Sequence, residues 1–254
     1  MTRSSPLSPD SYAQAYAEEY GFEEKMVRGR QKLLSELIDR LKPARVVEVG
    51  CGMDLLCECL SPDSPDLAWV IVEPSERFAK RARQAAPDTA HVTVIQQPLE
   101  GAVAQLASAL DGAPELVICS SLLHEVADVG RFLRAAKEAL RDGPGLLHIN
   151  VPNAGSLHRR LARRMGLIRD ETELTARNQR LGQPRVFDAE TLERAVTAAG
   201  LNIVDRGGYM LKPFTHEQME GLAFLDAPML AGLWELGRDL PELASEIFVN
   251  ARLP

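Results

Sequence analysis

The feature that most constrains the fold of this chain is a run of valines that stops at two glycines, VVEVGCG at residues 46–52. A nearly continuous run of β-branched residues is typical of a strand buried in a parallel sheet. Gly50 and Gly52 allow a tight turn and the close approach of a ligand, because glycine has no Cβ atom. The run therefore predicts a buried parallel strand that ends in a ligand-binding turn.

A second strand-like run, residues 68–72, ends at Glu73. A carboxylate at the tip of a second strand, about twenty residues after a glycine turn, is typical of a group that binds ribose hydroxyls. We therefore expect the first half of the chain to bind a nucleoside.

The residues around the turn narrow the kind of nucleoside. Leu55 stands where the dinucleotide fingerprint has its third glycine, and no Lys-Ser or Lys-Thr pair follows as in a triphosphate loop. Glu48, two residues before the first glycine, would repel a pyrophosphate and suits a positively charged ligand. S-adenosylmethionine carries a sulfonium and an ammonium group, so it fits this pattern.

The Glu-x-Gly-x-Gly run, followed by Val-Glu-Pro at residues 72–74, resembles the class I S-adenosylmethionine-dependent methyltransferases. The resemblance implies S-adenosylmethionine as cofactor. It implies that Glu48 interacts with the ammonium group, that Glu73 and Pro74 lie beside the ribose and adenine, and that Gly50, Cys51 and Gly52 form the loop around the cofactor. Asp54 departs from the family, which usually has a third glycine there.

Two further loops carry the resemblance. Gln97, followed by Pro98, stands at or near the position where the family places an acidic residue that reaches the adenine. An amide can bond the adenine edge, although an ordinary loop glutamine is the alternative. Ser120 and Ser121 stand where a backbone carbonyl of the family binds the ammonium group, and their small side chains fit a close approach.

The N-terminal segment supplies two kinds of candidate. Arg28 or Arg30 stands where the family often has an arginine that binds the methionyl carboxylate, a planar anion that suits guanidinium. Tyr12, Tyr16 and Tyr20 recur at every fourth residue and form one helix stripe. Tyr16 is our candidate for a residue that closes over the sulfonium or donates to the acceptor; core packing is the alternative.

His124, after the fourth predicted strand, is the candidate general base, because imidazole titrates near neutrality. A purely structural role beneath the cofactor loop is the alternative, and we favour it.

An arginine-rich stretch gives the candidate acceptor-binding residues His158, Arg159 and Arg163. Arg159 and Arg163 lie one helical turn apart, and this cationic surface on an acidic chain suits an anionic acceptor. A solvated face paired with Asp170, Glu171 and Glu173 is the alternative. The order of motifs here resembles the ubiquinone-biosynthesis-type methyltransferases, except that Gly182-Gln183-Pro184 lacks the histidine often found in that branch.

Strand and helix signals alternate along the chain, which predicts an α/β fold with a parallel sheet and helices on both faces. The resemblance implies a Rossmann-like, seven-stranded, mostly parallel sheet with an antiparallel last strand. We expect a disordered lead over residues 1–10 and one domain over 11–254. Its expected lid elements are residues 11–41, which read as helical, and two helical insertions at 153–184 and 215–242. For the two insertions, covering a sheet edge or making a dimer contact is the alternative.

Composition limits the remaining possibilities. The net charge of −7 over 254 residues argues against broad nucleic-acid binding. No apolar run has the ~20 residues of a membrane span, and the first residues lack a signal peptide's apolar core. The four cysteines form no CxxC pair, so we expect no metal and a cytoplasmic protein with reduced thiols. A homodimer is compatible with the sequence.

The sequence thus predicts methyl transfer from S-adenosylmethionine to an oxygen, nitrogen or carbon atom of a small molecule. A protein that binds the cofactor without catalysis, or an accessory subunit, is the main alternative, and a dehydrogenase is a weaker one.

Overall fold

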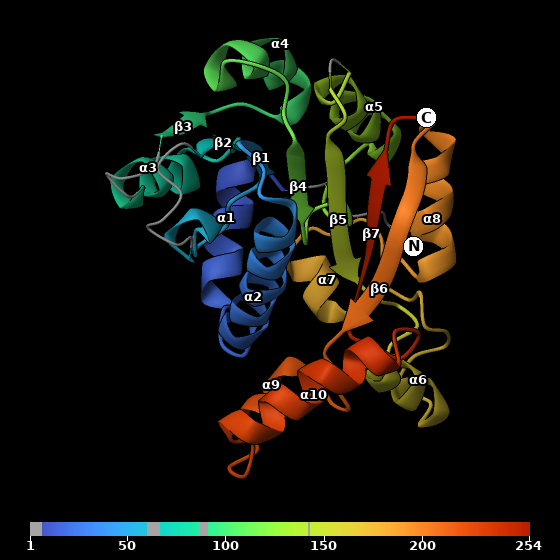
Figure 1. Ribbon diagram of the computed structural model, residues 1–254. Coiled ribbons are helices and arrows are strands. Elements are labelled where there is room, and N and C mark those ends of the chain that lie inside the picture. The colour runs from blue at the N-terminus through green and yellow to red at the C-terminus, as the bar shows by residue number, and fades with distance from the viewer. Residues whose placement is uncertain (1–6, 60–66, 87–90, 142) are drawn as a thin grey trace.

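The computed structural model describes residues 7–59, 67–86, 91–141 and 143–254. Its centre is a seven-stranded sheet with the strand order β3-β2-β1-β4-β5-β7-β6 (Figure 1). The strands are β1 (Arg45–Val49), β2 (Ala68–Val72), β3 (His91–Ile95), β4 (Leu116–Ser120), β5 (Leu146–Pro152), β6 (Asn202–Tyr209) and β7 (Glu246–Arg252). The first five strands are parallel, and β7 runs antiparallel to both of its neighbours.

Helices lie on both faces of this sheet. They are α1 (Pro9–Glu18), α2 (Glu23–Leu41), α3 (Glu76–Ala85), α4 (Leu99–Leu110), α5 (Val129–Ala139), α6 (Leu157–Arg164), α7 (Ala176–Arg180), α8 (Ala189–Ala198), α9 (His216–Glu220) and α10 (Ala227–Asp239), with a short 3-10 helix at Leu56–Cys59. One apolar cluster joins the sheet to α4, α5 and α8, and a second joins the opposite face to α1, α2 and α3. Neighbouring strand residues alternate between the two clusters, which explains why apolar residues stand next to one another in the central strands, as at Val46 and Val47 of β1.

The predicted fold class is confirmed, including the antiparallel last strand beside the sixth. The segment 11–41, expected to be helical, consists of two helices, because the chain turns at residues 19–22, where Gly21 disfavours helix and Tyr20 donates to the carboxylate of Asp54. Helix α1 also begins at Pro9, inside the expected lead, whose residues 1–6 lie outside the described residues.

Both insertions contain helices, as predicted, but they pack against different parts of the sheet. The segment 153–184 returns beneath the carboxyl ends of the strands with α7, whereas α9 and α10 form an arm against the end of β6 (Figure 1). Trp234 of that arm packs on α2, where a Cβ at Gly29 would lie 1.8 Å from the indole. Across the described residues, no helix is both long and apolar enough to cross a membrane.

Candidate functional site

A cavity of about 430 Å³ lies at the carboxyl ends of β1, β2 and β4, within the size range of small-molecule sites. Residues of α1 and α2 cover it, and residues 181–182 of the first insertion reach its rim. Most of the residues singled out in the sequence line this cavity. They are Tyr16, Arg30, Glu48, Gly50, Cys51, Gly52, Glu73, Pro74, Pro98, Ser120 and Ser121.

The glycine turn and Glu73 meet because β1 and β2 are parallel and end in register, with Val49 opposite Val72. Gly50 and Gly52 have φ values of 76° and 61°, a backbone conformation that favours glycine. Between them, the backbone N–H of Cys51 donates to Oε2 of Glu73 at 3.2 Å. The turn therefore brings exposed backbone against the carboxylate at the tip of the second strand.

Glu73 is buried, with 5% of its surface exposed, and its other oxygen accepts from the backbone N–H of Ser75 at 2.8 Å. Burial raises the pKa of Glu73 to about 7, against the lowering effect of these backbone hydrogen bonds. A buried carboxylate that lines a cavity still has lone pairs for further donors. The hydroxyls of a ribose are donors of that kind.

Glu48 also lines the cavity, but Oε2 of its carboxyl accepts from the indole nitrogen of Trp69 at 3.0 Å. Burial raises the pKa of Glu48 to about 8, which favours the neutral carboxyl at neutral pH. Its predicted contact with the ammonium group stays a prediction.

Arg28 and Arg30 of α2 differ in whether they face the cavity. The side chain of Arg28 is 73% exposed and pairs with Glu24 one turn away, so it does not face the cavity. Arg30 is buried and lines the cavity, yet its guanidinium binds Glu246 and, at 2.6 Å, Glu23. The one inward-facing arginine of the pair is therefore already neutralised by two carboxylates.

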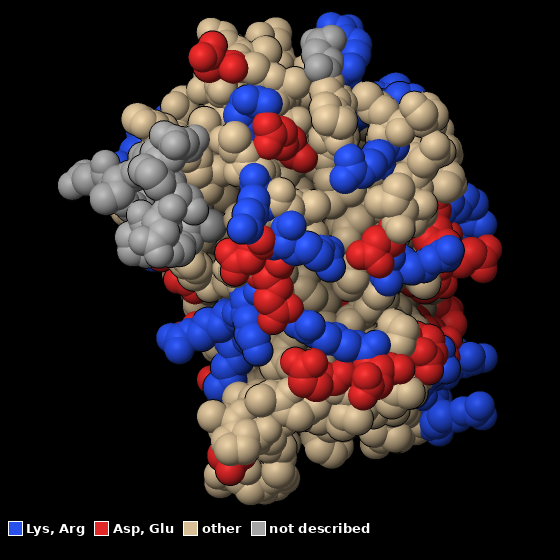
Figure 2. Space-filling view, viewed as in Figure 1, with Lys and Arg blue, Asp and Glu red and all other residues tan. Residues whose placement is uncertain are grey.

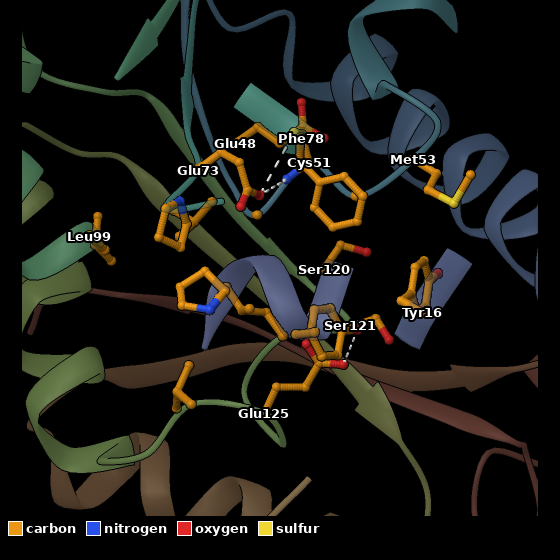
Figure 3. Close-up of a pocket in the computed structure, with 18 of the residues that line it drawn as sticks. Tyr16, Glu48, Cys51, Met53, Glu73, Phe78, Leu99, Ser120, Ser121 and Glu125 are labelled. Carbon is orange, nitrogen blue, oxygen red and sulfur yellow. Dashed lines mark hydrogen bonds between the residues drawn. The ribbon is translucent and has the colours of Figure 1, made fainter. Parts of the chain in front are cut away.

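Tyr16 and Tyr12 stack with ring centroids 5.7 Å apart, and both line the cavity. The Tyr12 hydroxyl donates to Oε1 of Glu125 at 2.5 Å. Glu125 itself lines the cavity opposite the glycine turn, as Figure 3 shows, with Ser121 nearby. Glu125 was not predicted from the sequence, because no local pattern pairs it with a tyrosine 113 residues earlier in the chain.

His124 is buried at 3% exposure and is not among the residues that line the cavity. Its Nε2 lies 3.1 Å from Nε2 of Gln183 and 3.4 Å from Oε1 of Glu125. His124 therefore contacts two neighbours behind the cavity wall, and its structural role stays a prediction.

Besides Arg28, four predicted binding residues lie away from the cavity. Gln97 is exposed and accepts from Gln105 at 3.4 Å. Nδ1 of His158 lies 3.1 Å from the Ser156 hydroxyl, and burial lowers the pKa of His158 far below its usual range. The other two are Arg159, which donates to backbone carbonyls of residues 171 and 173, and Arg163, which binds the carboxylate of residue 171 at 3.0 Å.

The arginine-rich stretch is thus folded onto its own insertion. Lys and Arg side chains alternate with Asp and Glu on the face in Figure 2, which does not present one large positive surface. Within the described ranges, no group of three or more His, Cys, Asp or Glu side chains is arranged to hold a metal ion.

Comparison with known proteins adds independent findings. Residues 16–206 match the family model described as a methyltransferase domain. A ribosomal RNA large subunit methyltransferase G of Pseudomonas fluorescens is 29% identical over 141 residues, which are 53% of this chain. The match covers 36% of that protein, so the chain spans about a third of the length of this curated relative.

Solved structures share the fold over most of the chain. An S-adenosylmethionine-dependent methyltransferase of Mesorhizobium loti is 20% identical with a TM-score of 0.53, over 82% of this chain and 90% of the other. The plantazolicin methyltransferase BamL, solved with S-adenosylhomocysteine and a triazolic desmethylplantazolicin analogue, is 10% identical with a TM-score of 0.60. That match covers 97% of this chain and 96% of the other. At these identities the likeness concerns the fold alone.

Proposed function

Since the chain belongs to the methyltransferase domain family, we propose that it transfers a methyl group from S-adenosylmethionine to a small-molecule acceptor in the cavity at the strand ends. The cofactor of such a domain is S-adenosylmethionine, which supplies a methyl group activated by a sulfonium charge. The observation that carries the proposal is the buried Glu73 carboxylate beside the glycine turn, within a cavity of small-molecule size.

The residues present fit the cofactor. Glu73 offers a buried acceptor for ribose hydroxyls, and the turn at residues 50–52 offers backbone with little side chain in the way. A Cβ at Gly52 would meet nothing within 4 Å, so there is open space above the turn. Ser120 and Ser121 line the same space from the end of β4, which supports their assignment to the methionyl end.

The covering helices support exclusion of water from this site. Asp10 accepts from the Ser75 hydroxyl at 2.7 Å, and Tyr12 donates to Glu125, so α1 is fixed to both sides of the cavity. We assign lid roles to residues 11–41 and 153–184, since both contribute lining residues. No lining residue comes from 215–242, and we assign that arm to packing on α2 and β6.

Chemistry at this site depends mainly on positioning. The chain orients the acceptor nucleophile in line with the activated methyl and shields both from water, which lowers the barrier through proximity and desolvation. Tyr12 and Tyr16 of α1 contribute two stacked aromatic rings to the wall of the acceptor space, which is of small-molecule size. This supports a small molecule over a nucleic acid, as does the net charge of −7.

Calorimetric titration with S-adenosylhomocysteine, followed by mass-spectrometric screening of acceptors with S-adenosylmethionine, tests the proposal. We expect saturable binding and one product heavier by a methyl group. Binding without turnover on any acceptor would favour the non-catalytic alternative, and no binding would contradict the assignment of the cavity.

A further inference from the structure

The end of the cavity opposite the glycine turn has its own carboxylate, Glu125. Figure 3 shows Glu73 and Cys51 at one end of the cavity and Glu125 at the other, beside Ser121 and facing the side of Tyr16. The ribose-binding assignment gives no role to Glu125. Ser120 and Ser121 are assigned to the methionyl end of the cofactor, so a ligand that lies beyond them against Glu125 is the acceptor, if the proposed function holds.

Glu125 is held in place by neutral donors. Its Oε1 accepts from the Tyr12 hydroxyl at 2.5 Å and from Nε2 of Gln183 at 3.2 Å. Burial and the neighbouring carboxylate raise the pKa of Tyr12, which keeps the phenol protonated as a donor. No hydrogen bond to Oε2 is found in the described part of the chain, and the side chain is 15% exposed. The carboxylate therefore has accepting capacity left toward the cavity.

The charges along the cavity favour a donor rather than an anion as its occupant. Among the described lining residues the only Lys or Arg is Arg30, and it is bound to Glu23 and Glu246. An anionic acceptor would meet no free cation there, and Glu125 would repel it.

Aromatic rings favour an amine among the possible donors. Tyr12 and Tyr16 stack beside Glu125, and the faces of tyrosine rings attract ammonium groups. The Tyr16 hydroxyl makes no hydrogen bond within the described residues, so it is available to the same ligand. A carboxylate beside aromatic faces is a combination that recognises amines.

Resting on the function proposed above, we propose that the Glu125 carboxylate binds the amino group of the methyl acceptor, which is therefore a small amine. Tyr12 and Gln183 act as positioning residues that hold the carboxylate. This inference replaces the anionic acceptor suggested by the arginine-rich insertion, whose side chains bind within the insertion itself.

Three probes of matched size test it: benzylamine, benzyl alcohol and benzoate, each titrated into protein saturated with S-adenosylhomocysteine. We expect benzylamine to bind with a Kd at least about fivefold lower than benzyl alcohol, and benzoate to bind worst. Glu125→Gln should abolish this preference and leave the S-adenosylhomocysteine affinity unchanged. Glu125→Asp should restore part of the preference, because it keeps the charge.

Two further variants test whether the charge of Glu125, rather than its hydrogen bond to Tyr12, gives the preference for the amine. Tyr12→Phe removes one hydrogen bond to Glu125 but keeps its charge, so the amine preference should persist. The matched control Glu190→Gln changes an exposed carboxylate on α8 and should behave as the unmodified chain. If benzylamine has no advantage, whether all three probes bind equally or none binds, or if the advantage survives in Glu125→Gln, the inference is wrong. Failure of S-adenosylhomocysteine itself to bind would instead contradict the proposed function.

Discussion

The two ends of the cavity are built in different ways. At the cofactor end, the glycine turn after β1 and Glu73 after β2 are adjacent because the two strands end in register. At the acceptor end, Tyr12, Glu125 and Gln183 meet although they are 58 or more residues apart in the chain. The first end uses the glycine turn and the Glu73 carboxylate at strand tips, whereas the second joins Glu125, from the loop after β4, to side chains of α1 and the first insertion.

This difference separates what is fixed by the sheet from what is set by the covering segments. A strand tip holds its backbone wherever the sheet forms, so the cofactor end follows from the fold. The acceptor end exists only when α1 and the insertion dock correctly. Such a division allows the acceptor to differ between proteins that share one cofactor site.

The largest effect is expected where the covering helices are anchored. Arg30→Met leaves Glu23 and Glu246 buried without their shared guanidinium, and should lower the free energy of unfolding by about 3–5 kcal/mol. The exposed Arg28→Met serves as the matched control, with a change of at most about 0.5 kcal/mol. Denaturant unfolding measures both. Similar small losses for the two variants would show that α2 is not anchored through Arg30.

Removing the carboxylate at one end of the cavity or at the other should affect cofactor affinity differently. Glu73→Ala should weaken S-adenosylhomocysteine binding by about 2–3 kcal/mol, the scale of a lost hydrogen-bond partner that carries charge. Glu125→Ala should change the same affinity by less than about 0.5 kcal/mol, because its carboxylate lies at the other end. Isothermal calorimetry decides. Equal losses would mean that the cofactor spans both carboxylates and that the division into two ends is wrong.

The cofactor end could be predicted from the sequence, whereas the acceptor end could not. The strands, the glycine turn and Glu73 could be predicted, because an apolar run and a short-range motif determine them locally. Glu125 could not, since its partner Tyr12 is distant and the intervening packing decides the contact. For the same reason the sequence predicted that the arginines of the insertion could bind an acceptor. In the structure the loop at residues 170–173 folds back and binds their side chains.

Protonation of Glu48 gives a pH-dependent effect confined to the cofactor end. Its pKa of about 8 lies above the ordinary 4.5, so the folded chain holds a proton that the unfolded chain releases between these values. The stability from this neutral carboxyl is complete below about pH 4.5 and is lost as pH rises through 8. Glu48→Gln is neutral at every pH, so its free energy of unfolding should fall less steeply, by about 1–3 kcal/mol over this range.

Unfolding of the cofactor-free protein in denaturant at pH 5, 6.5 and 8 measures this slope. Glu73 is present in both proteins, so the difference between them reports Glu48 together with its interaction with Glu73. Parallel stability curves for the two proteins would mean that Glu48 is ionised in the folded chain.

The smallest effect is expected from the insertion surface. Replacing Arg159, Arg160, Arg163 and Arg164 by glutamine removes four charges, and the first three of these arginines donate to acceptors within residues 155–173. The affinities for S-adenosylhomocysteine and for benzylamine should change by less than about twofold, since exposed charges away from the cavity contribute little. A marked loss of salt dependence in ligand binding would restore the anionic-acceptor hypothesis.

A crystal structure with S-adenosylhomocysteine tests the division of the cavity most directly. We predict both ribose hydroxyls within about 2.6–3.2 Å of the Glu73 carboxylate, and the thioether sulfur beside Ser120. The Glu125 carboxylate should face open space next to that sulfur, still bound to Tyr12. Electron density that places any part of the ligand against Glu125, or a ribose with no contact to Glu73, would contradict the account.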